Sequence, residues 1–103
     1  MVRQCFVRRY TAVTRPWFGF HTDTAQLTAN IALSHHGDHH GGVLLGLVQG
    51  TVRRIERGEG EATVHPSTLL HGVTRMRGGV RHSLIVFYET IEEACARHAR
   101  DRW

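Results

Sequence analysis

The sequence predicts a mainly all-β protein, a sandwich or jelly roll, that ends in one short helix. Several short segments are rich in β-branched and aromatic residues, and glycine-rich turns separate them. Helical periodicity appears only near the C-terminus. A length of 103 residues corresponds to one domain. We therefore expect a single domain over residues 1–103, with its core at about residues 5–88.

Strands are expected where alternating or continuously apolar segments end at turn residues. The strongest is residues 80–88, because β-branched and aromatic side chains follow one another almost without interruption. Gln49 and Gly50 form a tight connection between two other strands, and Pro66 ends a third. The expected strands are residues 5–10, 26–33, 42–48, 51–56, 61–65 and 80–88.

The C-terminal segment carries the signature of a helix start. Thr90 and Glu93 match the capping box, in which residues three apart satisfy each other's free backbone N–H groups. We expect a helix at about residues 90–101. Its apolar face would consist of Ile91, Ala94, Cys95 and Ala99.

The net charge is +4, and all 13 basic residues are arginine. A base-composition bias in the source genome accounts for this, although a basic protein also attracts nucleic acid or acidic peptides. The arginines are scattered, and no basic stretch is interleaved with the aromatic residues on which single-stranded bases stack. A nucleic acid partner is therefore not favoured.

Features that would indicate a compartment are scarce. No apolar run approaches the roughly 20 residues of a membrane-spanning helix, so no membrane partner is expected. Since no secretory leader follows Met1, the chain is either cytoplasmic by default or has its N-terminus further upstream. The two cysteines, Cys5 and Cys95, allow one disulfide, which is weak support for an oxidising compartment. Neither compartment nor oligomeric state is predicted.

A metal-binding pattern begins at His21-Thr22-Asp23. Residues two apart in an extended segment point to the same face, so the imidazole and the carboxylate can converge on one ion. A third ligand must come from a distant strand. His71 is the favoured candidate and His65 its competitor. Two histidines and one carboxylate leave positions open for substrate and dioxygen, as in non-haem Fe(II) sites.

Another histidine-rich stretch, residues 35–40, either binds metal by itself or forms a solvated loop. A structural zinc site is not favoured, because such sites are usually closed by four ligands and neither cysteine is near the histidines in sequence.

Arg81 and Ser83 share one face of the strongest strand with Ile85 and Phe87. An arginine on an inward face needs an anionic partner, and a guanidinium matches a carboxylate in bidentate fashion. The pair therefore indicates capture of a dicarboxylate inside the sheets. The alternative is that Arg81 and Ser83 face solvent and the residues between them form the core.

In their order along the chain, these motifs resemble the 2-oxoglutarate and Fe(II)-dependent oxygenase superfamily, most closely the catalytic domain of prolyl and lysyl hydroxylases. The H-P-x-x-L-x-H block at residues 65–71 and the T-x-N-I-A-L block at residues 28–33 are especially like lysyl hydroxylases. The resemblance spans about residues 5–88. Its matching positions are Tyr10, His21, Asp23, Thr28 to Leu33, Asp38, Gly41, Gly42, His65, Pro66, Leu69, His71, Gly79, Val80 and Arg81.

The resemblance implies a double-stranded β-helix that lacks the helices usually preceding it, and hence either a fragment or a minimal version of the domain. The implied iron ligands are His21, Asp23 and His71. The implied co-substrate pocket contains Arg81 at the C5 carboxylate of 2-oxoglutarate, Ser83 as its helper, Tyr10 on the preceding strand, and Asn30, which reaches the co-substrate or orients a ligand. At the pocket mouth, His39, His40 and Val43 depart from the family's aromatic and third glycine, which leaves the shape of the substrate entrance open.

The activity that the resemblance implies is hydroxylation of a C–H bond with Fe(II), 2-oxoglutarate and dioxygen, releasing succinate and carbon dioxide. Ascorbate is implied as a supporting cofactor. The expected substrate is a peptidyl prolyl or lysyl side chain or a related small molecule. Two other classes stay open: a non-catalytic jelly-roll module or truncated fragment that binds metal or ligand, and a basic protein associated with nucleic acid.

Overall fold

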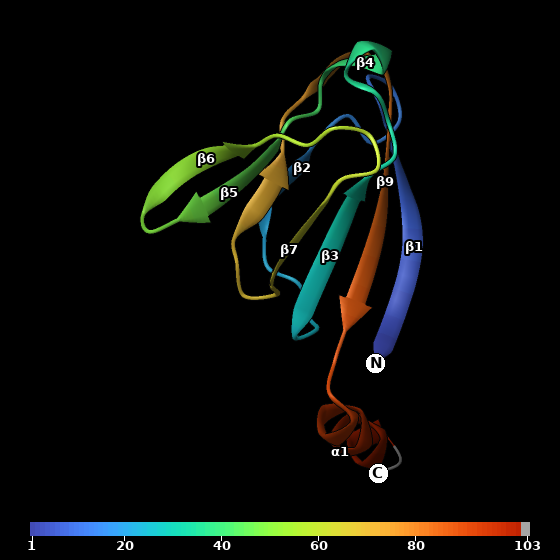
Figure 1. Ribbon diagram of the computed structural model, residues 1–103, viewed down its shortest axis with the longest axis vertical. Coiled ribbons are helices and arrows are strands. Elements are labelled where there is room, and N and C mark those ends of the chain that lie inside the picture. The colour runs from blue at the N-terminus through green and yellow to red at the C-terminus, as the bar shows by residue number, and fades with distance from the viewer. Residues whose placement is uncertain (102–103) are drawn as a thin grey trace.

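Two antiparallel sheets face each other in the computed structural model, which describes residues 1–101 (Figure 1). One sheet has the order β1-β9-β3-β7, with the short β4 also paired to β9, and the other has the order β2-β8-β5-β6. Apart from the β5–β6 hairpin and β4, the chain changes sheet at each successive strand, which is the winding of a jelly roll. The fold class expected from the sequence is confirmed.

The first sheet contains β1 (Val2–Thr11), β3 (Leu27–Ala32), β7 (Ala62–Pro66) and β9 (Met76–Tyr88), with β4 (His39–Gly41) on β9. The second contains β2 (Phe18–His21), β5 (Leu44–Val48), β6 (Thr51–Ile55) and β8 (His71–Val73). A single 3₁₀ turn, η1 (His36–Asp38), precedes β4 within the described residues. Each strand expected from the sequence is present, with shifted ends.

Three short strands, β2, β4 and β8, were not expected from the sequence. Each has only three or four residues, and glycine and histidine make up much of them, so their local β propensity is low. They form by pairing with neighbouring strands: β4 pairs with β9, and β8 pairs with both β2 and β5. Gly79 of β9 lies opposite His39 of β4 and has a φ of 75°, a conformation that favours glycine. A Cβ at Gly79 would lie 2.1 Å from the Asp38 carbonyl oxygen, so glycine allows the two segments to approach this closely.

The core between the sheets is built from Tyr10, Leu44, Val73 and Met76, with Phe18 and Ile55 packed against it. The strand β9 sends Arg81, Ser83 and Ile85 into this interior, where all three are buried. The interpretation in which Arg81 and Ser83 face inward is thus confirmed over the one in which they face solvent. Beside the apolar cluster, the buried residues include a set of polar and charged side chains: Thr28, Asn30, His65, Ser67, His71, Arg81, Ser83 and Glu89.

Helix α1 (Ile91–Asp101) follows β9 and stands apart from the sheets (Figure 1). The Thr90 hydroxyl accepts a hydrogen bond from the Glu93 N–H at 3.0 Å, as the capping signature predicts. The expected apolar face is not buried, however, and Ile91 is 72% exposed. The Arg97 guanidinium joins the helix to Glu89 at 2.7 Å and holds the pKa of that carboxyl below its usual range.

Cys5 and Cys95 are both exposed and form no disulfide, so the bridge that the sequence left open is not made.

Among residues 1–101, no helix combines the length and the apolar character that crossing a membrane requires.

Candidate metal centre

Two neighbouring strands of one sheet, β2 and β8, bring the predicted histidine ligands together. His21 is the last residue of β2, His71 is the first residue of β8, and the two are partners in the antiparallel ladder. Their imidazole rings lie with centroids 4.3 Å apart. Asp23 follows in the loop after β2, where its backbone N–H donates to the Ser67 carbonyl at 2.8 Å. The loop is thereby attached to the segment that leads into β8.

The three ligand atoms converge on a small volume. The Nε2 atoms of His21 and His71 lie 3.6 and 3.5 Å from Asp23 Oδ1, and the three ligand atoms all lie within 4.8 Å of one another. Metal–ligand bonds of about 2.1 Å at right angles put neighbouring ligand atoms about 3 Å apart. The observed separations are therefore close to those that one bound ion would impose.

Both imidazoles are held in the tautomer that a metal requires. His21 Nδ1 lies 2.8 Å from the Gly19 carbonyl oxygen, and His71 Nδ1 lies 2.9 Å from that of Leu69. A carbonyl can only accept, so Nδ1 carries a proton in each ring, and in a neutral ring of this tautomer Nε2 has the lone pair. Metal-binding histidines in proteins are commonly oriented in this way.

The carboxylate of Asp23 is positioned through its second oxygen. The Thr28 hydroxyl donates to Oδ2 at 2.6 Å, and the Ser67 hydroxyl lies 3.1 Å from that of Thr28. Thr28 and Ser67 are each 1% exposed, so this arrangement is dry and rigid. It leaves Oδ1 directed at the histidines. From the sequence, Thr28 was expected on the following strand but without a contact to Asp23. Ser67 was not expected to belong to the site.

Burial of the His71 ring lowers its pKa below the usual 6.5, while its bond to Leu69 and the charge of Asp23 oppose that shift. The ring is therefore neutral at physiological pH, which is the form that binds metal.

His65, the competing candidate, packs on His71 with ring centroids 4.8 Å apart. It is not one of the three converging groups, and its buried Nε2 has no hydrogen-bond partner.

The triad opens into a cavity of about 270 Å³ with aromatic walls. Tyr10, Asn30 and Leu44 line its inner part together with His71. Arg8 also lines this cavity and lies over the rings of Phe6 and Phe18, at 5.0 and 4.7 Å from their centroids.

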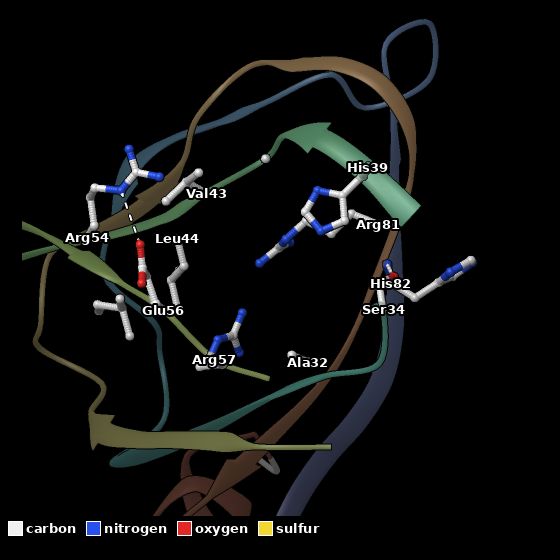
Figure 2. A pocket seen from close by; sticks show the side chains of 12 residues that line it. Ala32, Ser34, His39, Val43, Leu44, Arg54, Glu56, Arg57, Arg81 and His82 are labelled. Atoms are coloured by element: carbon white, nitrogen blue, oxygen red, sulfur yellow. Dashed lines mark hydrogen bonds and ion pairs between the residues drawn. The ribbon is translucent and has the colours of Figure 1, made fainter. Parts of the chain in front are cut away.

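Arg81 and Tyr10 are partners in the β1–β9 ladder, with the guanidinium 4.9 Å from the centre of the phenol ring. Arg81 is 4% exposed, and its Nη2 has no hydrogen-bond partner. Burial lowers its pKa, and Tyr10 opposes that shift. The side chain lines a second cavity of about 300 Å³ that shares Leu44 with the first (Figure 2). A buried donor of this kind fits an anionic ligand.

Ser83 and Asn30 are placed differently. Ser83 is buried beside this region, but its hydroxyl has no partner, and it is not among the residues that line either cavity. Asn30 lines the metal cavity, and its side-chain oxygen accepts a 2.6 Å hydrogen bond from Arg57 Nη1. Sequence analysis missed Arg57, because an arginine between Glu56 and Gly58 has no local feature that marks it as functional.

The histidine-rich segment at residues 35–40 is shaped by local hydrogen bonds. The His35 N–H donates to the Asp38 carboxylate at 2.9 Å, and His39 Nδ1 lies 2.8 Å from the Gly41 carbonyl oxygen. Among the side chains that the structure describes, this segment contributes none to the converging group. The side chain of His36 lies outside the described part.

No protein-family model and no curated protein sequence matches the chain. Among solved structures, it is similar to a 2OG-Fe(II) oxygenase family oxidoreductase from Burkholderia pseudomallei, with a TM-score of 0.74 and 23% identity over 86% of this chain and 44% of that one. It is also similar to a Pseudomonas putida prolyl-4-hydroxylase, with a TM-score of 0.69 and 24% identity over 82% and 50% of the two chains. The chain thus spans about half the length of each, and it shares the fold of these two oxygenases over that part.

Proposed function

We propose that this chain is the barrel of an Fe(II)- and 2-oxoglutarate-dependent dioxygenase that hydroxylates a C–H bond. The observation that carries the proposal is the convergence of His21, Asp23 and His71, all of which line one cavity. The fold shared with 2OG-Fe(II) oxygenases supports it. The proposed products are the hydroxylated substrate, succinate and carbon dioxide.

The donor set favours iron over structural zinc. Two imidazoles and one carboxylate leave coordination positions free, whereas a structural zinc site is closed by four ligands. Cys5 and Cys95 lie exposed on β1 and α1, and neither belongs to the converging group. When bound, Fe(II) with 2-oxoglutarate supplies the oxidising chemistry. The protein's part is to hold the three ligands, keep each Nε2 unprotonated and exclude water.

The proposed 2-oxoglutarate subsite lies on the Arg81 side of the interior. The buried Nη2 of Arg81 has a hydrogen bond to give, and a carboxylate would supply both the acceptor and the opposite charge. Tyr10 stacks on this guanidinium and also lines the metal cavity, so it joins the two ends of the subsite. Ser83 and Asn30 are proposed as further residues of this pocket.

The substrate is proposed to be a peptidyl prolyl or lysyl side chain or a related small molecule. The likeness to a prolyl-4-hydroxylase favours a prolyl side chain. Ascorbate is proposed as the reductant that keeps the iron in the Fe(II) state. The competing proposal is a non-catalytic jelly-roll module, or a truncated fragment of such an oxygenase, that binds metal or ligand without turnover.

Anaerobic binding followed by admission of oxygen tests the function. The purified chain should bind Fe(II) and 2-oxoglutarate under argon and release succinate when oxygen is admitted, whereas the variant His71→Ala should bind no Fe(II) tightly and release no succinate. If the wild-type chain binds both ligands but releases no more succinate than His71→Ala, it is a binding module. A mass-spectrometric screen for the gain of one oxygen among candidate peptides then identifies the substrate.

A further inference from the structure

We propose that Arg57 is a second guanidinium of the carboxylate subsite, so that Arg57 and Arg81 together bind one carboxylate of a dicarboxylic acid. This inference rests on the proposed function and assigns a specificity-determining residue to it. Figure 2 shows the two guanidiniums directed into the same cavity, Arg81 from β9 and Arg57 from the segment after β6. A strand and a connecting segment that are distant in sequence therefore direct their side chains into one space.

The cavity provides positive charge without a carboxylate to match it. Its lining includes Glu56, but that side chain lies 3.7 Å from Arg54 Nε, and both are largely exposed. Among residues 1–101, no ion pair joins Arg57 or Arg81 to an acidic group. Two guanidiniums that share a partly dry cavity repel each other, and an anion between them removes that repulsion.

The positive charge of Arg81 also affects the protonation of Arg57. Burial, followed by the positive charge of Arg81, lowers the pKa of Arg57 to about 10. Arg57 therefore stays protonated at neutral pH, and the repulsion persists in the ligand-free protein.

Arg57 is held in place before any ligand arrives. Its Nη1 donates to the backbone oxygen of Asn30 at 2.7 Å and to the side-chain oxygen of Asn30 at 2.6 Å. These two bonds use one terminal nitrogen, and a guanidinium has five N–H donors, so donors remain for a ligand. Asn30 itself is 6% exposed. Its function in the pocket is thus to position Arg57.

Arg81 is equally restrained. The Tyr10 ring lies against its guanidinium, and Gly42 lies against its aliphatic stem, where a Cβ would come within 3.0 Å of Arg81 Cδ. Two cations fixed in advance lose little conformational entropy when an anion binds, and this increases affinity. Ligands that lack the second carboxylate should therefore bind much more weakly than dicarboxylates.

Glutarate binding to the metal-free chain tests the inference without turnover. Isothermal titration of glutarate should give a dissociation constant that increases about tenfold in Arg57→Gln, the loss expected for one charge-assisted hydrogen bond. Arg54→Gln is the matched control, because Arg54 lines the same cavity but is largely exposed, and its effect should be less than about twofold. Asn30→Ala should weaken glutarate binding in the same direction as Arg57→Gln. Fe(II) affinity should be unchanged in Arg57→Gln and Arg54→Gln.

The specificity arm uses the Zn(II)-loaded chain, which cannot turn over. Here 2-oxoglutarate should bind more tightly than 2-oxopentanoate, which lacks the distal carboxylate, and Arg57→Gln should reduce that preference. If Arg57→Gln binds glutarate like the wild type, while Arg81→Gln does not, Arg57 is structural and the inference is wrong. If Arg57→Gln does not fold, Arg57→Lys keeps the charge without the planar fork and should show intermediate affinity.

The two proposals fail in different ways. Wild-type chain that binds no glutarate contradicts the inference about Arg57. Chain that binds glutarate through Arg57 but releases no succinate contradicts the catalytic function and leaves the carboxylate subsite in place.

Discussion

His21 and His71 are paired across the β2–β8 ladder, with the Nε2 atoms of both within 3.6 Å of the same Asp23 oxygen. At this distance the three groups are too far apart for good hydrogen bonds to one another. Each ring instead uses Nδ1 for a backbone carbonyl. The arrangement directs lone pairs toward a common point, and this is the geometry from which the metal-binding predictions follow.

Replacing His71 by alanine should abolish tight Fe(II) binding, because two ligands remain where three are needed. The informative comparison is His65→Ala, which removes the neighbouring ring that is outside the converging group. Fe(II) or Co(II) titration under argon measures both variants. Loss of metal binding in His65→Ala with retention in His71→Ala would mean that the wrong histidine has been assigned.

Thr28→Val should weaken metal binding about tenfold, because the Asp23 carboxylate loses the hydrogen bond that orients it. The valine keeps the volume and the β preference of threonine. Thr63→Val is the matched control, since the Thr63 hydroxyl is buried without a partner, and its removal should leave metal affinity unchanged. Equal effects of the two substitutions in a metal titration would contradict a role for Thr28 at Asp23.

Arg81→Met should weaken 2-oxoglutarate binding far more than Fe(II) binding. The same substitution should raise the stability of the ligand-free chain by roughly 1 kcal/mol, because it removes a buried charge that has no anionic partner. Urea denaturation without ligand and calorimetric titration of 2-oxoglutarate measure the two effects. Equal loss of iron and 2-oxoglutarate binding would show that Arg81 has a structural role.

The stability of the metal-free chain should fall as the pH decreases below 6.5. Burial lowers the pKa of His71 in the folded state, so between that pKa and 6.5 the unfolded chain binds more protons than the folded chain. Stability is then complete above 6.5 and is lost as the pH falls toward the folded-state pKa. Denaturation midpoints from pH 8 to pH 5 measure this slope, which should be reduced in His71→Gln and unchanged in the variant of an exposed histidine, His40→Gln.

Gly42→Ala should destabilise the chain more than Gly50→Ala does. Both glycines have positive φ, 67° and 77°, so both substitutions carry the same backbone strain of about 1 kcal/mol. A Cβ at Gly42 would also lie 2.3 Å from Met76 Sδ and 3.0 Å from Arg81 Cδ, whereas nothing lies within 4 Å at Gly50. The additional cost should be about 1–3 kcal/mol in thermal or chemical denaturation. Equal destabilisation would show that the core yields at Gly42.

Much of the fold could be predicted from local sequence patterns. The β-rich segment that ends at Tyr88 is strand whatever its neighbours are, and its alternation placed Arg81 and Ser83 on one face. Strands β2, β4 and β8 could not be predicted from the sequence, because segments of three or four residues acquire strand geometry only from the neighbours with which they pair. The exposed face of α1 was missed for a similar reason, since periodicity does not show whether a partner surface exists.

Local sequence pattern was enough to predict the all-β class, the His21 and Asp23 pair and the resemblance to 2-oxoglutarate oxygenases, but it left open whether Arg81 faces inward or toward solvent. Only the tertiary structure decided between His71 and His65, because a ladder partner of His21 is set by long-range pairing. Likewise, only the tertiary structure connected Thr28 to Asp23 and brought Arg57 to Asn30 and Arg81. Alternation along a strand determines which face of the sheet a side chain occupies. The strand that pairs with it, and the register of the pair, depend on burial of apolar surface across the whole sheet.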